Sequence, residues 1–331
     1  MGVAGLRWDG SRWPWPVYGI EDEDRWGYRD LPQIWQQFTH GEGGILFSVW
    51  DPGRCFETVE LDLHGCRRWG YFAVDAENIH GTLSGPAADA IRAYERVLAY
   101  GEWGSRVLRP LRQAPVPYLP HGLDLGTWQP VRGAPRRMVG CVAANQARKD
   151  LGLLFAAWKE MREADPSLLF WLHTDLQVTA AWSIPQLAED FGFNTKEGGL
   201  IVTTNLRDEE LAGLYSQCLV TIAPGLGEGF GYPIVESLAC GTPVVHGEYG
   251  GGAELIPRAW QVDLWAERIE GAYALKRPVY AASSVADMAL GLVKAMRENG
   301  AVMQAACRGM VAHLDWRALW PRWSSWFRGS N

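Results

Sequence analysis

The 331-residue sequence lacks the features that mark membrane, secreted and disulfide-rich proteins. No apolar run approaches the about 20 residues that a membrane-spanning helix needs. The first residues carry Arg7 and Asp9 without an apolar core, so we expect no signal peptide. Its six cysteines are scattered without a CxxC pair, which predicts reduced, buried thiols rather than a disulfide framework or a zinc site. We therefore expect a cytoplasmic protein with no stable membrane insertion.

An excess of positive charge is also missing. The chain has 31 Lys and Arg against 38 Asp and Glu, for a net charge of −7. Nothing global in this balance points to nucleic acid or to an anionic membrane, although a local basic face remains open. The length suits two domains, and a hydrophobic content of 47% indicates a globular protein.

Eighteen tryptophans are the most unusual feature of the composition. They cluster near the two ends of the chain, at Trp8, Trp13, Trp15, Trp26 and Trp35, then at Trp316, Trp320, Trp323 and Trp326. Aromatic rings can stack on sugars or bases, but they more often fill a core, and we favour the core.

The pattern between Leu219 and Leu255 organises the rest of the chain. Residues 219–223 form a compact apolar run of strand length, and a turn with alternating glycines comes after it. Pro233 suits the start of a helix, and Gly241 suits its end. The stretch therefore predicts a strand, a glycine-rich turn and a short helix, whose first N–H groups and dipole favour an anion.

Two carboxylates, Glu228 and Glu236, fall within this anion site. A carboxylate repels phosphate, but it accepts hydrogen bonds from hydroxyl groups and can hold a cis-diol with both oxygens. An anion site flanked by two diol acceptors matches a nucleotide sugar, which has a diphosphate between a ribose and a sugar.

The sequence from Glu228 to Glu236 is a Glu-x7-Glu motif, with Ala-Pro before it and Ala-Cys-Gly-Thr-Pro-Val-Val after it. These residues resemble the family 4 (group 1) retaining glycosyltransferases, which have the GT-B fold. The resemblance implies that Glu228 contacts the donor sugar and Glu236 the ribose. It also implies that the backbone around Gly229, Phe230 and Gly231 meets the phosphates. A plain strand–helix–strand unit with helix-capping glutamates is the alternative.

A second part of the donor site comes after the expected strand at residues 138–143. In the resembled family, a basic pair after such a strand reaches the donor diphosphate, and Arg148 and Lys149 fit that position. Two cations offset most of the charge of a diphosphate, which would make a metal unnecessary. The alternative is a solvated helix start, but basic residues in a first helical turn oppose the helix dipole. We expect Asn145 to shape this turn on the donor side.

Other site residues lie near strand ends. Asn205 comes after an expected strand at 200–203, where relatives hold the nucleotide base. Asp51 and Asp75 come after expected strands at 44–50 and 69–74, and such carboxyl ends bind ligands in open α/β sheets. The resemblance places both on the acceptor side, with Asp75 the better match; equally, both can simply end strands and cap the next segment of the chain. His121 lies in a turn like the family's PxGxD turn, so it is acceptor-side or structural.

Glu21 to Asp24 contain an Asp-x-Asp triplet, which can mark a metal-dependent sugar transferase. It lies in a polar stretch rather than directly after a strand, so we interpret it as a solvated acidic turn and expect no metal.

Strands and helices alternate in both halves, which predicts an α/β protein with two doubly wound, Rossmann-like domains facing a cleft. We expect an acceptor-side domain at 1–133, joined by a C-terminal helix at 312–331 that crosses back to it, and a nucleotide-sugar domain at 134–311. The expected helices are 31–38, 87–99, 151–161, 208–216 (capped by Asp208) and 285–296. The resemblance covers roughly residues 95–260 well.

The predicted function is that of a metal-independent retaining glycosyltransferase that uses a nucleotide-diphosphate sugar. A UDP-sugar is the donor we expect first, and we expect no cofactor. Arg148 and Lys149 would stabilise the leaving diphosphate, Glu228 would hold the sugar, and Asp75 would act at the acceptor. Three alternatives remain: another GT-B enzyme such as an epimerase or phosphorylase, a nucleotide-sugar-binding protein without turnover, and a phage-type transferase that acts on hydroxymethylated DNA. For the last, a local basic face would come from Arg92, Arg96, Arg106, Arg109 and Arg112.

Overall fold

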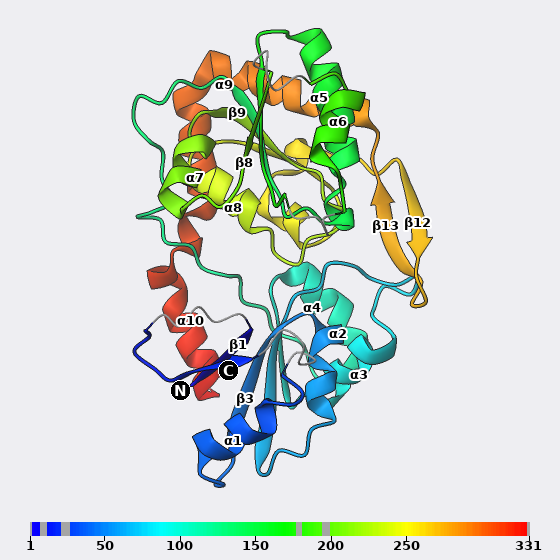
Figure 1. The fold of residues 1–331 in the computed structure, drawn as a ribbon, viewed down its shortest axis with the longest axis vertical. Helices are drawn as coiled ribbons and strands as arrows, with labels where there is room; N and C mark the ends of the chain where they lie inside the picture. Colours follow the sequence, from blue (N-terminus) through cyan, green and yellow to red (C-terminus); the bar gives the residue numbers. More distant parts are fainter. Residues whose placement is uncertain (1, 7–11, 21–26, 177–180, 194–198, 330–331) are drawn as a thin grey trace. The chain divides into compact units, whose positions relative to one another are not determined.

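The structure is a computed structural model that describes residues 2–6, 12–20, 27–176, 181–193 and 199–329 (Figure 1). Contacts divide it into two compact units, one of Met1–Tyr118 with Gly271–Leu275 and one of Leu119–Glu270 with Lys276–Asn331. This division lies earlier than the expected boundary at 133 and groups the last helix with the second unit. The division groups residues by their contacts and does not show which segments fold together. The predicted domain boundaries therefore stay a prediction.

The first unit is built on a parallel sheet of three strands in the order β3-β4-β5. These strands are β3 (Gly44–Trp50), β4 (Cys66–Phe72) and β5 (Arg96–Ala99), and β1 (Val3–Leu6) pairs with β2 (Val17–Ile20) in a separate parallel sheet. The helices are α1 (Leu31–Thr39), α2 (Pro52–Cys55), α3 (Gly85–Ala93) and α4 (Glu102–Leu108), with short 3-10 turns at Glu57–Val59 and Arg109–Leu111. Phe72, Ile91 and Leu108 are fully buried in its core.

The helix predicted at 87–99 is wrong in its second half. Helix α3 ends at Ala93, and residues 96–99 form strand β5 beside Trp69–Phe72 of β4. Val97, Leu98 and Ala99 are consecutive and all buried, which suits a strand of a parallel sheet better than one side of a helix. Arg112 donates to the carbonyl oxygens of Ile91 (2.9 Å) and Tyr94 (2.6 Å) and so satisfies the end of α3. The strand predicted at 69–74 is also shifted, to 66–72.

The second unit has a six-stranded parallel sheet in the order β11-β10-β9-β6-β7-β8 (Figure 1). Its strands are β6 (Met138–Val142), β7 (Leu169–His173), β8 (Leu200–Thr203), β9 (Cys218–Ala223), β10 (Val244–Gly247) and β11 (Gln261–Val262). They are nearly continuous apolar runs, as expected of a parallel sheet covered on both faces. A separate two-stranded sheet joins β12 (Ala266–Glu270) to β13 (Leu275–Val279).

Six helices belong to the described part of the second unit. They are α5 (Leu151–Ala164), α6 (Ile184–Asp190), α7 (Asp208–Tyr215), α8 (Tyr232–Ala239), α9 (Ala282–Val311) and α10 (Trp316–Arg328). Short 3-10 turns occur at Ala147–Lys149, Gly251–Leu255, Arg258–Trp260 and Ala312–Leu314. Helix α9 packs against α5, α8 and strand β9. The helix predicted at 285–296 is one part of the longer helix α9.

The predicted cap of α7 is wrong. Arg207, not Asp208, precedes the helix, and its backbone N–H donates to the Glu210 carboxylate at 3.0 Å. Asp208 is instead the first helical residue, where a negative charge favours the helix dipole.

The tryptophans fill the core only in part. Trp158 and Trp171 are fully buried around the second sheet, and Trp35, Trp323 and Trp326 are also buried. Trp13, Trp316 and Trp320 are exposed. Trp8 and Trp26 lie outside the described residues.

Candidate functional site

The glycine-rich turn between β9 and α8 has the backbone that its sequence predicts. Gly231 precedes α8 with a φ of 100°, a left-handed conformation that favours glycine, and Pro233 lies in the first turn. The Gly250–Gly252 turn after β10 supports it, because the Gly251 N–H donates to the carbonyl oxygen of Glu228 at 2.8 Å. A Cβ on Gly251 would lie 2.5 Å from the carbonyl oxygen of Gly229, so the two turns pack backbone to backbone.

Three of the predicted donor-site residues meet at this turn. Lys149 Nζ donates a hydrogen bond to Glu228 Oε1, and Arg148 Nη1 lies 3.6 Å from Glu228 Oε2. Arg148 also donates to the carbonyl oxygen of Gly227 at 3.2 Å. Burial alone would raise the pKa of Glu228, but the charges of Lys149 and Arg148 outweigh it and hold the pKa below its usual value. A buried carboxylate therefore meets two cations here, and Glu228 and Lys149 line one small cavity with Gly225 and Ile234.

Glu236 lies within α8, in an electrostatic environment different from that of Glu228. The Tyr215 hydroxyl donates to Glu236 Oε2 at 3.0 Å. Burial raises the pKa of Glu236 to about 7; the nearby charge of Asp208 adds to this effect and the Tyr215 hydrogen bond opposes it. The two glutamates of the motif thus differ, since Glu228 is held ionised by cations and Glu236 titrates near neutral pH.

A buried histidine that the sequence reasoning missed adjoins the same turn. His246 in β10 is 1% exposed, and its Nδ1 lies 2.6 Å from the carbonyl oxygen of Ala223 at the end of β9. Its Nε2 makes no hydrogen bond within the described part of the chain, and a Cβ on Gly252 would lie 2.6 Å from it. Burial lowers the pKa of His246, so the ring is neutral. The available signal was a histidine inside the apolar strand that leads into the second glycine turn.

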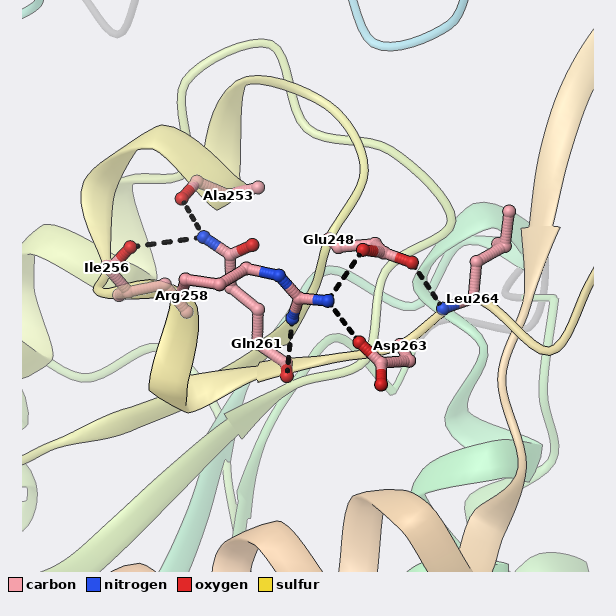
Figure 2. Close-up of polar contacts among 7 residues, drawn as sticks. All are labelled: Glu248, Ala253, Ile256, Arg258, Gln261, Asp263 and Leu264. Atoms are coloured by element: carbon pink, nitrogen blue, oxygen red, sulfur yellow. Dashed lines mark hydrogen bonds and ion pairs between the residues drawn. The ribbon is translucent and has the colours of Figure 1, made fainter.

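A polar cluster fixes the segment after that second turn (Figure 2). Gln261 donates to the carbonyl oxygens of Ala253 (2.7 Å) and Ile256 (3.2 Å). Arg258 donates to Glu248 Oε2 at 3.0 Å and pairs with Asp263, and Glu248 Oε1 accepts from the backbone N–H of Leu264 at 2.6 Å. These contacts tie residues 248–264 together and so position the Gly250–Gly252 turn against Glu228.

Asn145 shapes its turn as expected. Its amide donates to the carbonyl oxygen of Trp182 (2.8 Å), and its side-chain oxygen accepts from the Trp182 N–H (2.9 Å). This arrangement buries the residue, which is 7% exposed. Asn205 is the second residue after β8. It has a φ of 53° and is exposed. Contact of either residue with a donor stays a prediction.

The acceptor-side aspartates lie in the first unit, beyond the ends of β3 and β4. Asp51 caps α2, because its Oδ1 accepts from the Gly53 N–H at 2.7 Å. Burial raises the pKa of Asp51, and the negative charge of Asp75 raises it further, so the two carboxylates are near one another. The capping function expected as one alternative is therefore present for Asp51, while an acceptor function for either residue stays a prediction.

His121 lies in the second unit, where it touches the donor turn. Its ring centroid lies 5.1 Å from that of Phe230 and 5.1 Å from that of Tyr232. Burial lowers the pKa of His121 to about 4, so the ring is neutral at pH 7. Its acceptor-side function stays a prediction.

The described residues form neither a metal site of clustered ligands nor a membrane-spanning helix. Within the described ranges there is no cluster of three or more His, Cys, Asp or Glu that could hold a metal ion. The Asp-x-Asp triplet at residues 22–24 lies outside those ranges. None of the helices in the described part is both long and apolar enough to cross a bilayer.

The region that carries this site is similar to known proteins. Residues 136–274 match the family model of glycosyl transferases group 1. This segment is a group 1 glycosyltransferase domain. It contains Arg148, Lys149, Glu228 and Glu236, and the resemblance seen in the Glu-x7-Glu motif is confirmed.

Two curated relatives of this glycosyltransferase domain are mannosyltransferases. The chain is 31% identical over 140 residues to the MMP alpha-(1->4)-mannosyltransferase of Mycolicibacterium hassiacum. The matched region covers 42% of this chain and 32% of that protein. It is 31% identical over 112 residues to the serotype-specific mannosyltransferase WbdA of Escherichia coli, covering 33% of this chain and 13% of WbdA. The matched part of the chain thus spans a third or less of the length of these relatives.

Solved structures resemble nearly the whole chain at low identity. HepE of Anabaena in complex with UDP-glucose superposes with a TM-score of 0.71 at 14% identity, covering 95% of this chain and 86% of HepE. Sucrose-phosphate synthase of Thermosynechococcus elongatus gives a TM-score of 0.70 at 17% identity, covering 95% and 81%. The glycosyltransferase domain therefore belongs to an α/β protein of the GT-B fold with two Rossmann-like parts, and the predicted fold class is confirmed.

Proposed function

We propose that the protein transfers a sugar from a nucleotide-diphosphate sugar to an acceptor hydroxyl, with retention at the anomeric carbon and without a metal ion. The observation that carries this proposal is the meeting of Lys149, Arg148 and Glu228 at the glycine-rich turn before α8. Glu236 lies farther along the chain, within α8, and we assign it to the ribose side.

The chemistry depends on a change of partners. A diphosphate at the turn attracts Lys149 and Arg148 away from Glu228, because its charge exceeds that of one carboxylate. Arg148 can hold two phosphate oxygens at once, and Lys149 acts as a point charge. Both cations then stabilise the charge that builds on the leaving diphosphate. Glu228, freed of its ion pair, accepts hydrogen bonds from the sugar hydroxyls.

The retaining outcome rests on the family resemblance. In that mechanism the acceptor oxygen attacks the anomeric carbon from the face that the diphosphate leaves, so no covalent enzyme intermediate is needed. Asp75 and Asp51 are the candidates for contact with the acceptor.

The relatives suggest a hexose donor. Two curated relatives are named mannosyltransferases, and a structural neighbour is described in complex with UDP-glucose. We therefore take a nucleotide-diphosphate hexose as the donor class and a saccharide hydroxyl as the acceptor class.

The structure lends little to the DNA-acceptor alternative. Four of the five arginines of the suggested basic face are already engaged: Arg92 with Asp89 (2.8 Å), Arg106 with Glu77 (3.0 Å), Arg112 with backbone carbonyls, and Arg96 over the ring of Trp69 (4.5 Å). The carboxylate partners offset the charges of Arg92 and Arg106, so these two would attract a phosphate backbone less than unpaired arginines would.

A donor-binding and turnover experiment tests the proposal. Thermal shifts with UDP, GDP, ADP and their hexose conjugates are measured with and without EDTA, and donor hydrolysis or transfer is measured by nucleotide release. We expect a specific shift that survives EDTA, and loss of turnover in Arg148→Ala/Lys149→Ala. Normal turnover in that double variant would contradict the phosphate assignment, and binding without any transfer or hydrolysis would support the non-catalytic alternative.

A further inference from the structure

Three polar side chains form a hydrogen-bonded chain where β7 and β8 end. The indole N–H of Trp171 donates to Thr203 Oγ1 at 2.9 Å, and Thr203 Oγ1 lies 3.0 Å from His173 Nδ1. His173 and Thr203 are direct partners in the parallel register and are the last residues of their strands. They therefore lie at the carboxyl edge of the sheet, where open α/β sheets bind ligands.

The hydrogen bonds of Thr203 leave its hydroxyl hydrogen available to His173. An indole N–H can only donate, so the Thr203 oxygen accepts from Trp171, and the hydroxyl can either donate its own hydrogen to His173 Nδ1 or accept a second hydrogen bond from it. Where Thr203 donates, Nδ1 is the acceptor and the ring hydrogen is on Nε2. Burial lowers the pKa of His173, and Asp175 opposes this shift only in part, so the ring is neutral. In that tautomer the ring presents one N–H donor, at Nε2.

The same chain connects to the ribose side of the donor site. The ring of Trp171 packs edge-on against Tyr215, with centroids 5.6 Å apart, and Tyr215 donates to Glu236. The contacts therefore lead from Glu236 through Tyr215 and Trp171 to Thr203 and His173. Glu228, the partner of Lys149, lies in the turn just before the helix that carries Glu236. The site therefore matches the order of parts of a nucleotide sugar: sugar and diphosphate, then ribose, then base.

We propose that His173 is a specificity-determining residue that selects the base of the donor nucleotide by donating its Nε2 hydrogen to a ring carbonyl oxygen. This proposal rests on the proposed function, and it names the donor class as uracil or guanine nucleotides. Cytosine and adenine have an exocyclic amino group at the same place. That amino group and the His173 Nε2–H are both hydrogen-bond donors, so neither would be paired. In this proposal Thr203 is the positioning residue: its hydroxyl donates to His173 Nδ1 and so keeps the ring hydrogen on Nε2.

The test compares the affinities of UDP, GDP, CDP and ADP by isothermal titration calorimetry. The wild-type protein is expected to bind UDP or GDP at least about tenfold more tightly than CDP and ADP. His173→Phe keeps an aromatic ring beside Trp171 but has no N–H. It is expected to lose that preference by weakening the favoured nucleotide about tenfold, with little change for CDP and ADP.

A second pair of variants separates orientation from folding. Thr203→Val keeps the volume but removes the hydroxyl, so it should reduce base selectivity, whereas Thr203→Ser keeps the hydroxyl and should retain it. Circular dichroism and thermal unfolding establish that each variant is folded. If His173→Phe does not fold, the Val and Ser pair decides the question alone.

The outcomes are distinct. Equal weakening of all four nucleotides in Thr203→Val or His173→Phe, or no base preference in the wild type, would overturn the role of His173 while leaving the proposed function intact. Failure of the wild type to bind any nucleotide would overturn the proposed function and this inference with it.

Discussion

Lys149 and Glu228, 79 residues apart in the sequence, form a hydrogen-bonded ion pair whose side chains are only 10% and 12% exposed. Removing two charges from water is costly, and the pair is tolerated because each partner compensates the other. The same residues serve different parts of the proposed donor, the ammonium for diphosphate and the carboxylate for sugar. Stability and function are therefore coupled at this pair.

Lys149→Met should be strongly destabilising as well as inactive. The substitution leaves the Glu228 carboxylate buried without its main partner, which costs about 3–5 kcal/mol for pairs of this kind. We expect the free energy of unfolding, measured with urea near neutral pH, to fall by that order, and sugar transfer to be lost.

The double variant Lys149→Met/Glu228→Leu is the control. With both charges gone, most of the lost stability should return, but transfer should not. Equal stability of the single variant and the wild type would show that the pair is not buried in solution as it is here.

Glu236 predicts a pH dependence of stability. Its pKa is about 7 in the folded protein and 4.5 as an ordinary glutamate, so folding favours the protonated form. The stabilising effect is full below pH 4.5 and is lost as the pH rises through about 7, a change of at most about 3 kcal/mol.

Glu236→Gln removes that titration. The glutamine oxygen can still accept from Tyr215, so the variant should be more stable than the wild type at about pH 8 and nearly equal to it at about pH 5. Its affinity for nucleotides should fall, because the amide oxygen is a weaker acceptor for a diol than a carboxylate. Thermal unfolding at both pH values, with and without nucleotide, measures both effects. A variant less stable than the wild type at the higher pH would contradict the raised pKa.

The backbone contact between the two glycine turns can be tested with one methyl group. Gly251→Ala would place a Cβ 2.5 Å from the carbonyl oxygen of Gly229, so the donor turn must shift. We expect donor affinity to fall at least about tenfold and stability to fall by about 1–3 kcal/mol.

Gly309→Ala is the matched control. Gly309 lies within α9, and an added Cβ there meets nothing within 4 Å. A helical glycine replaced by alanine should stabilise the protein by about 0.5–1 kcal/mol and leave donor binding unchanged. Similar donor affinities in the two variants would show that the turn contact does not matter for binding.

The sequence was sufficient for the parts of the site that depend on local patterns. Glu228, Arg148 and Lys149 each come after a parallel strand, and the carboxyl ends of parallel strands meet at one edge, so their meeting could be predicted. Helix α1, strand β3 and strand β8 also lie where their patterns place them.

The features that the sequence did not reveal depend on contacts between distant segments. Residues 96–99 have an apolar pattern that fits one side of a helix, and only pairing with β4 makes them a strand. The Tyr215–Glu236 hydrogen bond joins different elements, as does the chain from Trp171 through Thr203 to His173, and no local spacing reveals either. His246 resembles an ordinary core position until the fold brings Gly252 over its ring.

His121 gives an acid-sensitivity prediction that is independent of donor binding. Its pKa is about 4 in the folded protein and 6.5 as an ordinary histidine, because the ring is buried against Phe230 and Tyr232. Between about pH 6.5 and pH 4, the unfolded chain therefore binds a proton at His121 that the folded protein does not bind. The contribution to stability is full above pH 6.5 and is lost as the pH falls through about 4, by roughly 1–3 kcal/mol.

His121→Phe keeps the aromatic contacts but cannot take up that proton. Its stability relative to the wild type should therefore rise steadily as the pH is lowered from about 7.5 to about 4.5, whatever its offset at the higher pH. Urea unfolding at several pH values within this range gives the difference, in which the titrations shared by both proteins cancel. Parallel pH profiles would mean that His121 takes up a proton as readily in the folded protein as in the unfolded chain. Its ring would then be open to solvent rather than packed on the donor turn.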